Sequence, residues 1–144
     1  MSRRSIAIFA VVFAMIVIGA AALHRYMDET YRNYSALCVT EAFLKFHLSA
    51  SLEPDFPESW TTIAEEYDAF CAKTETSFAL AELQHRVTIN WRTGKQYIQQ
   101  RTATDKQLAI ITLVDGSTVR WHGDDPNANV IRFIQEMQRP VPGK

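Results

Sequence analysis

The stretch Ile6–Leu23, IAIFAVVFAMIVIGAAAL, contains no charged side chain and decides where the rest of the chain can fold. A helix of this stretch rises about 27 Å, close to the roughly 30 Å of hydrocarbon in a bilayer. Its many Ile, Val, Phe and Leu residues each favour insertion by about 0.3–0.6 kcal/mol, so insertion is favoured by about 3–6 kcal/mol in total. The sequence therefore predicts a transmembrane helix over 6–23.

The flanking charges predict the orientation of this helix. Arg3 and Arg4 precede it, whereas Arg25 on the other side is soon followed by acidic residues. Because basic residues stay on the cytoplasmic side of a spanning helix, we expect residues 1–5 in the cytoplasm. The sequence thus predicts a single-pass protein of the cell (inner) membrane that exports residues 24–144 to the periplasmic or extracytoplasmic side.

Two other interpretations of the N-terminus stay open. A cleaved signal peptide would use 6–18 as its apolar region and Ala20-Ala21-Ala22 as its cleavage site, so the domain would be secreted after a cut near Ala22. The start Ser2-Arg3-Arg4-Ser5-Ile6 also resembles a twin-arginine export signal. We favour the permanent anchor, because the apolar run reaches bilayer length and its flank, 26–34, is typical of a continuing helix with interfacial aromatics.

The composition leaves room for one exported domain. The 144 residues are 47% hydrophobic and 22% charged, with two cysteines and a formal net charge of −1. Arg3 and Arg4 precede the apolar segment, so the other 13 of the 15 basic side chains and all 16 acidic ones follow it. Residues 24–144 therefore have a formal charge of −3. An acidic domain does not indicate a nucleic-acid partner. The composition also excludes a low-complexity chain and a cysteine-stapled mini-protein.

Three helices are expected in the exported part. Their apolar residues recur at steps of three and four, and Asp55 and Asp125 are each placed to cap a helix N-terminus. Pro126 follows Asp125 at the first helical position, where proline is favoured. The predicted helices span 24–52, which continues from the membrane, then 57–73 and 126–138.

Between these helices the apolar period changes to two, most plainly at Val87 and Ile89. Asp115-Gly116 is a strong hairpin signal between two further segments. The sequence therefore predicts a four-stranded antiparallel meander over 78–122, with Phe78–Leu83 open between strand and helix. The fold class is α+β, with the N-terminal helix packed on this small sheet. The expected strands are 86–92, 97–102, 108–114 and 118–122.

Cys38 and Cys71 both lie on expected apolar helix faces. In an exported domain a disulfide between them is expected, since oxidising compartments preserve such bonds. It would close a loop of about 33 residues and stabilise the domain by about 3–4 kcal/mol. Two separate buried thiols are the alternative.

Leu37, Leu44 and Leu48 form a second apolar stripe on the first exported helix. A helix with two apolar faces is covered on two sides, and a partner protein or a second copy of the chain could supply one cover. A small domain wrapped around its own helix is the alternative. Tyr97 and Trp121 join this possible partner surface, because Tyr and Trp are common in binding hot spots.

His122, Asp124 and Asp125 offer an imidazole and two carboxylates on one loop. A second histidine at ligand spacing is missing from the sequence, and it contains no hydrolase or nucleotide-binding motif. We therefore expect no catalytic, metal or cofactor site. A tethered or secreted hydrolase that uses this loop is the alternative.

The layout of a membrane helix that continues into an exported helix and packs on an antiparallel sheet resembles type IV pilins and the pseudopilins of type II secretion. The hairpin Leu113–Arg120, with Asp115-Gly116-Ser117 at its turn, is similar to a turn near the end of some pilin-like proteins. The resemblance implies an envelope component with this topology. It implies no functional residues, because no Gly precedes Ile6 and no acidic residue lies between Ser5 and Leu23.

These expectations combine into one functional hypothesis. The chain is held in membrane lipid through 6–23, and its exported domain acts as a non-enzymatic protein-interaction or structural subunit, with a protein partner or a homo-oligomer in the envelope. A pilin-like component and a hydrolase are the alternatives.

Overall fold

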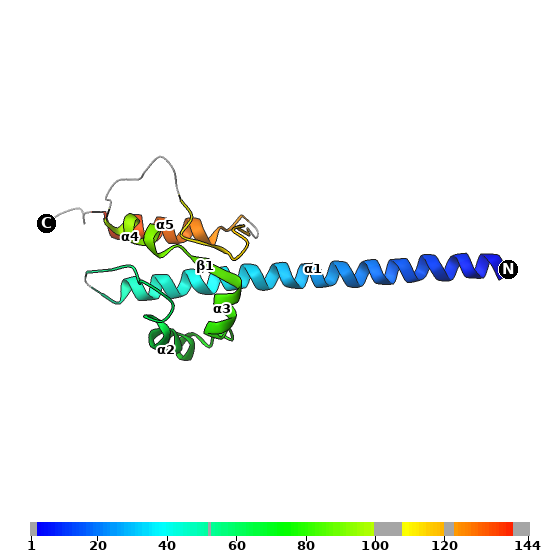
Figure 1. Cartoon of the computed structure of the whole chain (residues 1–144), viewed down its shortest axis with the longest axis horizontal. Coiled ribbons are helices and arrows are strands. Elements are labelled where there is room, and N and C mark those ends of the chain that lie inside the picture. Colours follow the sequence, from blue (N-terminus) through cyan, green and yellow to red (C-terminus); the bar gives the residue numbers. More distant parts are fainter. Residues whose placement is uncertain (1–2, 52, 100–107, 120–122, 140–144) are drawn as a thin grey trace. The chain divides into compact units, whose positions relative to one another are not determined.

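A computed structural model describes residues 3–51, 53–99, 108–119 and 123–139. Its longest element is helix α1 (Arg3–Ser49), and Figure 1 shows the order of the elements along the chain. The chain divides into two compact units, Met1–Arg32 and Asn33–Lys144, so α1 contributes to both. All other described helices and strands belong to the second unit.

The first unit is helical and exposes its apolar side chains. Phe9 and Ile18 expose 70% and 68% of their surface, and no side chain described between Ile6 and Leu23 is buried. This helix is long and apolar enough to cross a membrane, a property that it shares with signal sequences. The helix predicted over 6–23 is confirmed.

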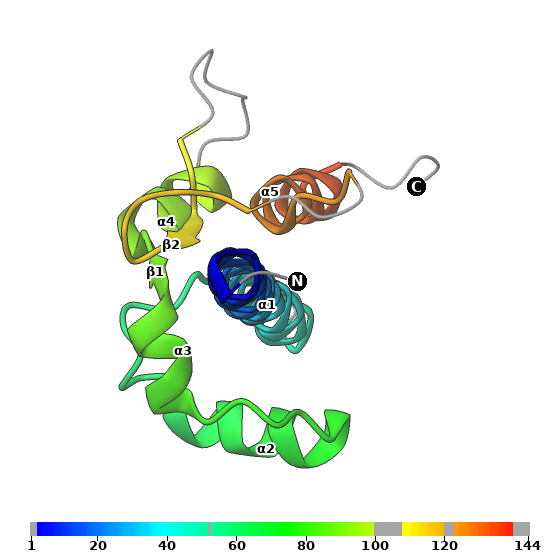
Figure 2. The ribbon, with the colours of Figure 1, turned by 90° about the vertical axis from the view of Figure 1, so that its right-hand side faces the viewer.

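The second unit is built around the C-terminal part of α1. Figures 1 and 2 show α2 and α5 on different sides of this part of α1. The described elements of the unit are α2 (Ala64–Thr74), α3 (Leu80–Arg86), β1 (Val87–Ile89), α4 (Trp91–Gln99), β2 (Ile111–Leu113) and α5 (Pro126–Met137).

Phe43 of α1 lies near the centre of the core. The rings of Tyr67 and Phe70, both on α2, meet it edge-on at centroid distances of 5.2 and 5.4 Å. Edge-to-face pairs of this kind add about 0.5–1.5 kcal/mol each to the burial of the rings. Aliphatic side chains from other parts of the second unit are also fully buried, among them Ile63, Leu83, Ile111 and Ile134.

Within the described residues the sheet has two strands. β1 and β2 pair antiparallel, with Thr88 opposite Thr112 at the centre. The Oδ1 atom of Asn127, on α5, accepts hydrogen bonds from the N–H groups of Ile110 and Ile111 at 2.7 and 3.1 Å. This side chain therefore attaches β2 to α5.

The four-stranded meander predicted over 78–122 is wrong. Helix α4 occupies the start of the predicted edge strand 97–102, whose last three residues lie outside the described ranges. The cause is Asn90, whose Oδ1 accepts a hydrogen bond from the Thr93 N–H at 3.0 Å, while its carbonyl accepts one from the Gly94 N–H at 3.0 Å. These bonds cap a helix directly after β1, so the chain does not turn back as a strand.

The other strand predictions fail in part. The turn predicted at Asp115-Gly116 forms, because the Gly116 N–H donates to the Leu113 carbonyl at 2.9 Å and Gly116 has a φ of +82°. No strand follows it at 118–119, and the remainder of the predicted strand, 120–122, lies outside the described residues. The segment Phe78–Leu83, left open above, leads into α3.

The predicted helices are present with shifted ends. α5 begins as expected, because the Asp125 side chain accepts a hydrogen bond from the Ala128 N–H at 3.1 Å. α2 begins at Ala64 instead of residue 57, so Asp55 is not its N-cap. The residues before it are held in a local turn, in which the Thr62 hydroxyl donates to a backbone carbonyl three residues earlier at 2.7 Å. The first helix ends at Ser49, three residues before the predicted end.

Candidate functional site

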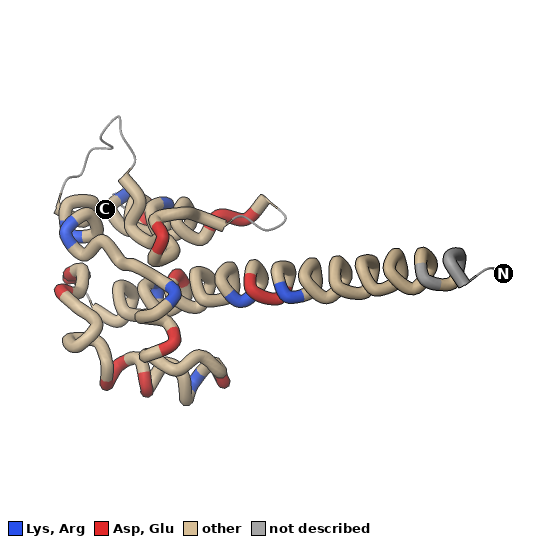
Figure 3. The backbone as a smooth tube through the Cα atoms, turned by 45° about the vertical axis from the view of Figure 1, so that its right-hand side comes forward, with Lys and Arg blue, Asp and Glu red and all other residues tan. Residues whose placement is uncertain are grey.

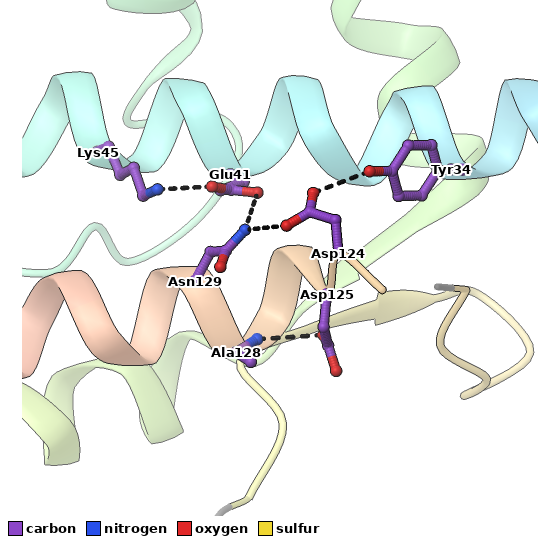
Figure 4. A network of polar contacts seen from close by, with 7 residues as sticks. All are labelled: Tyr34, Glu41, Lys45, Asp124, Asp125, Ala128 and Asn129. Atoms are coloured by element: carbon purple, nitrogen blue, oxygen red, sulfur yellow. Dashed lines mark hydrogen bonds and ion pairs between the residues drawn. The ribbon is translucent and has the colours of Figure 1, made fainter. Parts of the chain in front are cut away.

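A chain of polar side chains connects α1 with the N-terminal end of α5 (Figure 4). The Tyr34 hydroxyl donates to Asp124 Oδ2 at 2.8 Å, and Asn129 Nδ2 donates to Asp124 Oδ1 at 2.8 Å. The same amide nitrogen lies 3.3 Å from Glu41 Oε2, and Lys45 Nζ lies 2.6 Å from Glu41 Oε1. We call these five residues the α1–α5 polar network.

Helical spacing explains how α1 presents its share of the network. Tyr34, Glu41 and Lys45 are separated by seven and four residues, so all three lie on one side of the helix. The other two residues of the network lie on either side of the first turn of α5. Asp124 precedes the capping residue of α5 and Asn129 follows it on the next turn, so one short segment supplies both partners.

The electrostatics of the network keep Asp124 ionised. Hydrogen bonds from Asn129 and Tyr34 hold the pKa of the Asp124 carboxyl below its usual value. The pKa of the Tyr34 phenol is raised by its hydrogen bonds with Cys38 and Asp124. The pKa of the Cys38 thiol is also raised, first by burial. At neutral pH the carboxylate is therefore an acceptor only, and the phenol and the thiol keep their protons.

The α1–α5 polar network holds α1 and α5 together and is not arranged as a catalytic or metal site. The described carboxylates of the predicted loop do different structural work: Asp124 bonds to Tyr34 and Asn129, whereas Asp125 caps α5. Figure 4 shows the two side chains pointing away from each other. His122, the third residue of the predicted group, lies outside the described residues. In the described part of the chain, no three His, Cys, Asp or Glu side chains are placed to hold a metal ion.

The disulfide predicted between Cys38 and Cys71 is not present, since both cysteines are free and half-buried. The two thiols have different neighbours. Cys38 contacts Tyr34 on α1, whereas the Cys71 sulfur lies 3.9 Å from the carbonyl oxygen of Phe78. The alternative interpretation, two separate thiols, describes this structure.

The leucines of the predicted partner surface lie inside the domain. Leu37, Leu44 and Leu48 expose 2%, 0% and 1% of their surface, because other elements of the second unit cover them. Tyr97 is buried on α4, and Trp121 lies outside the described residues. The interpretation of the leucines as an open partner surface is therefore corrected in favour of a domain wrapped around its own helix.

Several side chains that join the elements were not identified from the sequence. His47 Nδ1 lies 2.5 Å from Glu66 Oε2 and connects α1 with α2. Gln138 Nε2 donates to two carbonyls at the end of α4 at 2.6 and 2.9 Å. Tyr34 and Asp124 are 90 residues apart, and no local pattern pairs residues at that separation. Asn90 alone carried a usable signal, because Asn is a favoured N-cap residue.

Comparison with protein-family models, with curated proteins and with solved structures gives no match to this chain.

Proposed function

We propose that this protein is anchored by a single N-terminal membrane helix and exports a domain that acts by binding another protein, as an accessory or structural subunit. The observation that supports this is a contrast within α1. Apolar side chains between Ile6 and Leu23 are exposed, whereas Leu37, Leu44 and Leu48 are buried by the domain itself. A segment that exposes so much apolar surface needs an environment other than water.

The described carboxylates of the predicted loop have structural partners, which does not favour the hydrolase alternative. The network residues Tyr34, Asp124 and Asn129 satisfy one another, and Asp125 is used as a helix cap. A general base would instead need a free carboxylate or imidazole within reach of a reacting group. A tethered domain acquires a role from its position, since anchoring raises its effective concentration beside other membrane components.

The anchor is tested by extraction and topology. A phosphatase reporter fused after Lys144 should be active, a fluorescent reporter that folds only in the cytoplasm should be dark, and the chain should stay in membranes at high pH. Ile16→Lys should strongly reduce this retention, because a lysine at the helix centre costs about 3 kcal/mol, half or more of the insertion free energy of the segment. Val114→Lys is the matched control, since Ile16 and Val114 are similarly exposed, at 63% and 59%. A chain that washes off membranes, or a mature N-terminus at Leu23, refutes the permanent anchor.

The binding role is tested in membranes from the natural host. Solubilised in mild detergent, the chain should migrate on a native gel in a discrete complex larger than its own monomer. Mass spectrometry should identify the same components after crosslinking in intact membranes. A chain that runs as a monomer before and after crosslinking contradicts the proposal.

A further inference from the structure

One strip of α1 is left open within the second unit. From Asn33 to Ser49 nearly every residue of the helix is buried or half-buried, yet Ala42 in the middle is exposed. Cys38 and Phe46 lie one turn before and one turn after it, and both are half-buried. We call Cys38, Ala42 and Phe46 the α1 strip.

The strip runs between two helices that cover other sides of α1. On one side α2 packs against Phe46, whose ring lies 5.6 Å from that of Phe70. On the other side α5 approaches, and its Phe133 ring lies 5.9 Å from Lys45 Nζ. Figure 2 shows α2 and α5 on different sides of α1. The exposed Ala42 therefore lies on a helix face that the described residues do not cover.

A lysine stands on each side of the strip. Lys45, next to α5, already pairs with Glu41 at 2.6 Å. Lys73, on α2, is exposed, and its recorded contact is with the Phe46 ring, 5.4 Å from Nζ to the centroid. Within the described ranges no carboxylate pairs with Lys73. The strip thus carries apolar side chains and is small at Ala42, with the Lys73 ammonium group at its α2 side.

The outer side of α2 has the complementary chemistry. Glu65, Asp68, Ala69 and Ala72 are all exposed, and their spacing places them on one helix face. This face combines two carboxylates with two methyl groups. Figure 3 shows acidic residues in red along α2.

We propose that a second copy of the chain binds the α1 strip through the outer face of its own α2, so that carboxylates of one copy approach Lys73 of the other. The alanines of α2 would meet Ala42, where small side chains allow close approach, and opposite charges would fix the register. Since two different surfaces meet, the contact is head-to-tail, and it forms a ring if the rotation between copies closes. This inference rests on the proposed function, because it names the partner of the anchored domain.

The direct test is photocrosslinking of the full-length chain in its native membranes. A benzophenone amino acid replaces Ala42, and we expect an adduct of twice the chain's mass with the crosslinked peptide inside α2. The matched control carries the same probe at Val114, which is 59% exposed and lies beyond β2, and should give no such adduct. No self-adduct at Ala42, an equal adduct at Val114, or an adduct with a different protein overturns the proposal.

A charge exchange in the chain that carries the Ala42 probe tests which charges make the contact. Asp68→Lys and Lys73→Glu are each expected to reduce the self-adduct at least fivefold, and the chain with both changes should recover it, since the ion pair between copies is restored in reverse. The two residues are five apart on one helix and do not face each other, so recovery reports the contact between copies. A double variant as weak as the single variants refutes the contact.

The two proposals fail separately. A chain that resists extraction at high pH but gives no self-adduct contradicts only the second-copy contact. A chain that washes off membranes yet still forms the adduct contradicts only the anchor.

Discussion

Gly94 allows the closest approach between two segments of the domain. It lies in α4, and a Cβ atom added there would lie 2.3 Å from Cε1 and 2.4 Å from Cζ of Phe56. Carbon atoms without a bond between them prefer about 3.5–4.0 Å. The Phe56 ring is 1% exposed and packs against Trp91 at a centroid distance of 6.3 Å, so it has little room to retreat. Gly94→Ala must therefore displace the ring or the helix.

The net effect is the difference between two opposing terms. Alanine in a helix interior is favoured over glycine by about 1 kcal/mol. Overpacking a well-filled core costs about 1–3 kcal/mol, and a contact this short belongs at the upper end of that range. We expect Gly94→Ala to lower the free energy of unfolding by about 1–2 kcal/mol. Urea unfolding of the full chain in mild detergent, followed by tryptophan fluorescence, measures it. A variant more stable than the natural chain refutes the reasoning.

The sign of the effect should change when the ring is removed. Phe56→Ala alone should cost about 3–5 kcal/mol, because it leaves a cavity. In that background Gly94→Ala no longer meets a ring, so only the helix preference remains and the second change should stabilise by up to about 1 kcal/mol. Equal destabilisation by Gly94→Ala in both backgrounds would show that the contact with Phe56 is not the cause.

Four further outcomes follow from the polar contacts and the free thiols. Asp125→Ala removes the cap of α5 and should cost about 1 kcal/mol in urea unfolding, whereas Asp125→Asn should cost less. Asn127→Ala leaves two N–H groups at the start of β2 without their acceptor and should cost about 1–3 kcal/mol, with unchanged helix content by circular dichroism. The pKa of Asp124 is lowered in the folded chain, so its contribution to the free energy of unfolding is present above the unfolded pKa near 4 and is lost as pH falls through the folded pKa. Asp124→Asn should therefore make the free energy of unfolding less dependent on pH between about pH 5 and pH 2. An unchanged pH profile contradicts the network. Labelling under denaturing, non-reducing conditions should modify both Cys38 and Cys71, and a chain without free thiols contradicts the structure.

The sequence was sufficient for helices whose ends carry their own chemical signals. α5 follows Asp125-Pro126, where the cap and the first helical position are both specified within two residues. α1 needs no such signal over 24–49, since this part contains no Gly or Pro and a helix propagates once its first turn has formed. α2 was placed seven residues too early, because hydroxyl groups before Ala64 bond to the backbone and hold a turn there.

The sheet was mispredicted because a short alternation of apolar and polar residues does not show where a strand ends. Val87 and Ile89 do lie on one side of a strand, and both are buried. Trp91 continues the same alternation, but Asn90 caps a helix that begins at Trp91, so the strand ends at Ile89, three residues before its predicted end. Gly94 lies between two of the predicted strands, 86–92 and 97–102, but it is part of α4, where the Phe56 ring leaves no room for a Cβ atom. Both causes are contacts that a strand pattern does not contain.

The leucine stripe illustrates a different limit. The sequence correctly predicted that this stripe is buried, since apolar side chains are stabilised by leaving water. Its members are Leu37, Leu44 and Leu48. The sequence did not state whether the cover comes from the same chain or another one, because the apolar surface is identical in both cases. The sequence does not predict the α1–α5 polar network for a related reason: Tyr34 and Asp124 lie far apart in the sequence and meet only once the domain has folded around α1.

The two parts of α1 differ in how their apolar side chains are covered: those between Ile6 and Leu23 are exposed, whereas Leu37, Leu44 and Leu48 are buried. This difference is the physical argument for an anchor. A soluble monomer rarely exposes a continuous apolar patch above a few hundred Å². The large apolar residues described between Ile6 and Leu23 expose 45–70% of their surfaces around the whole helix, which amounts to roughly 1,000 Å² and, at about 25 cal/mol per Å², to tens of kcal/mol in water. An ion pair or a loop from the domain is too small to offset that cost. We therefore expect lipid to cover this segment, and the second unit, which buries Leu44 and Phe43 by itself, needs no such cover to fold.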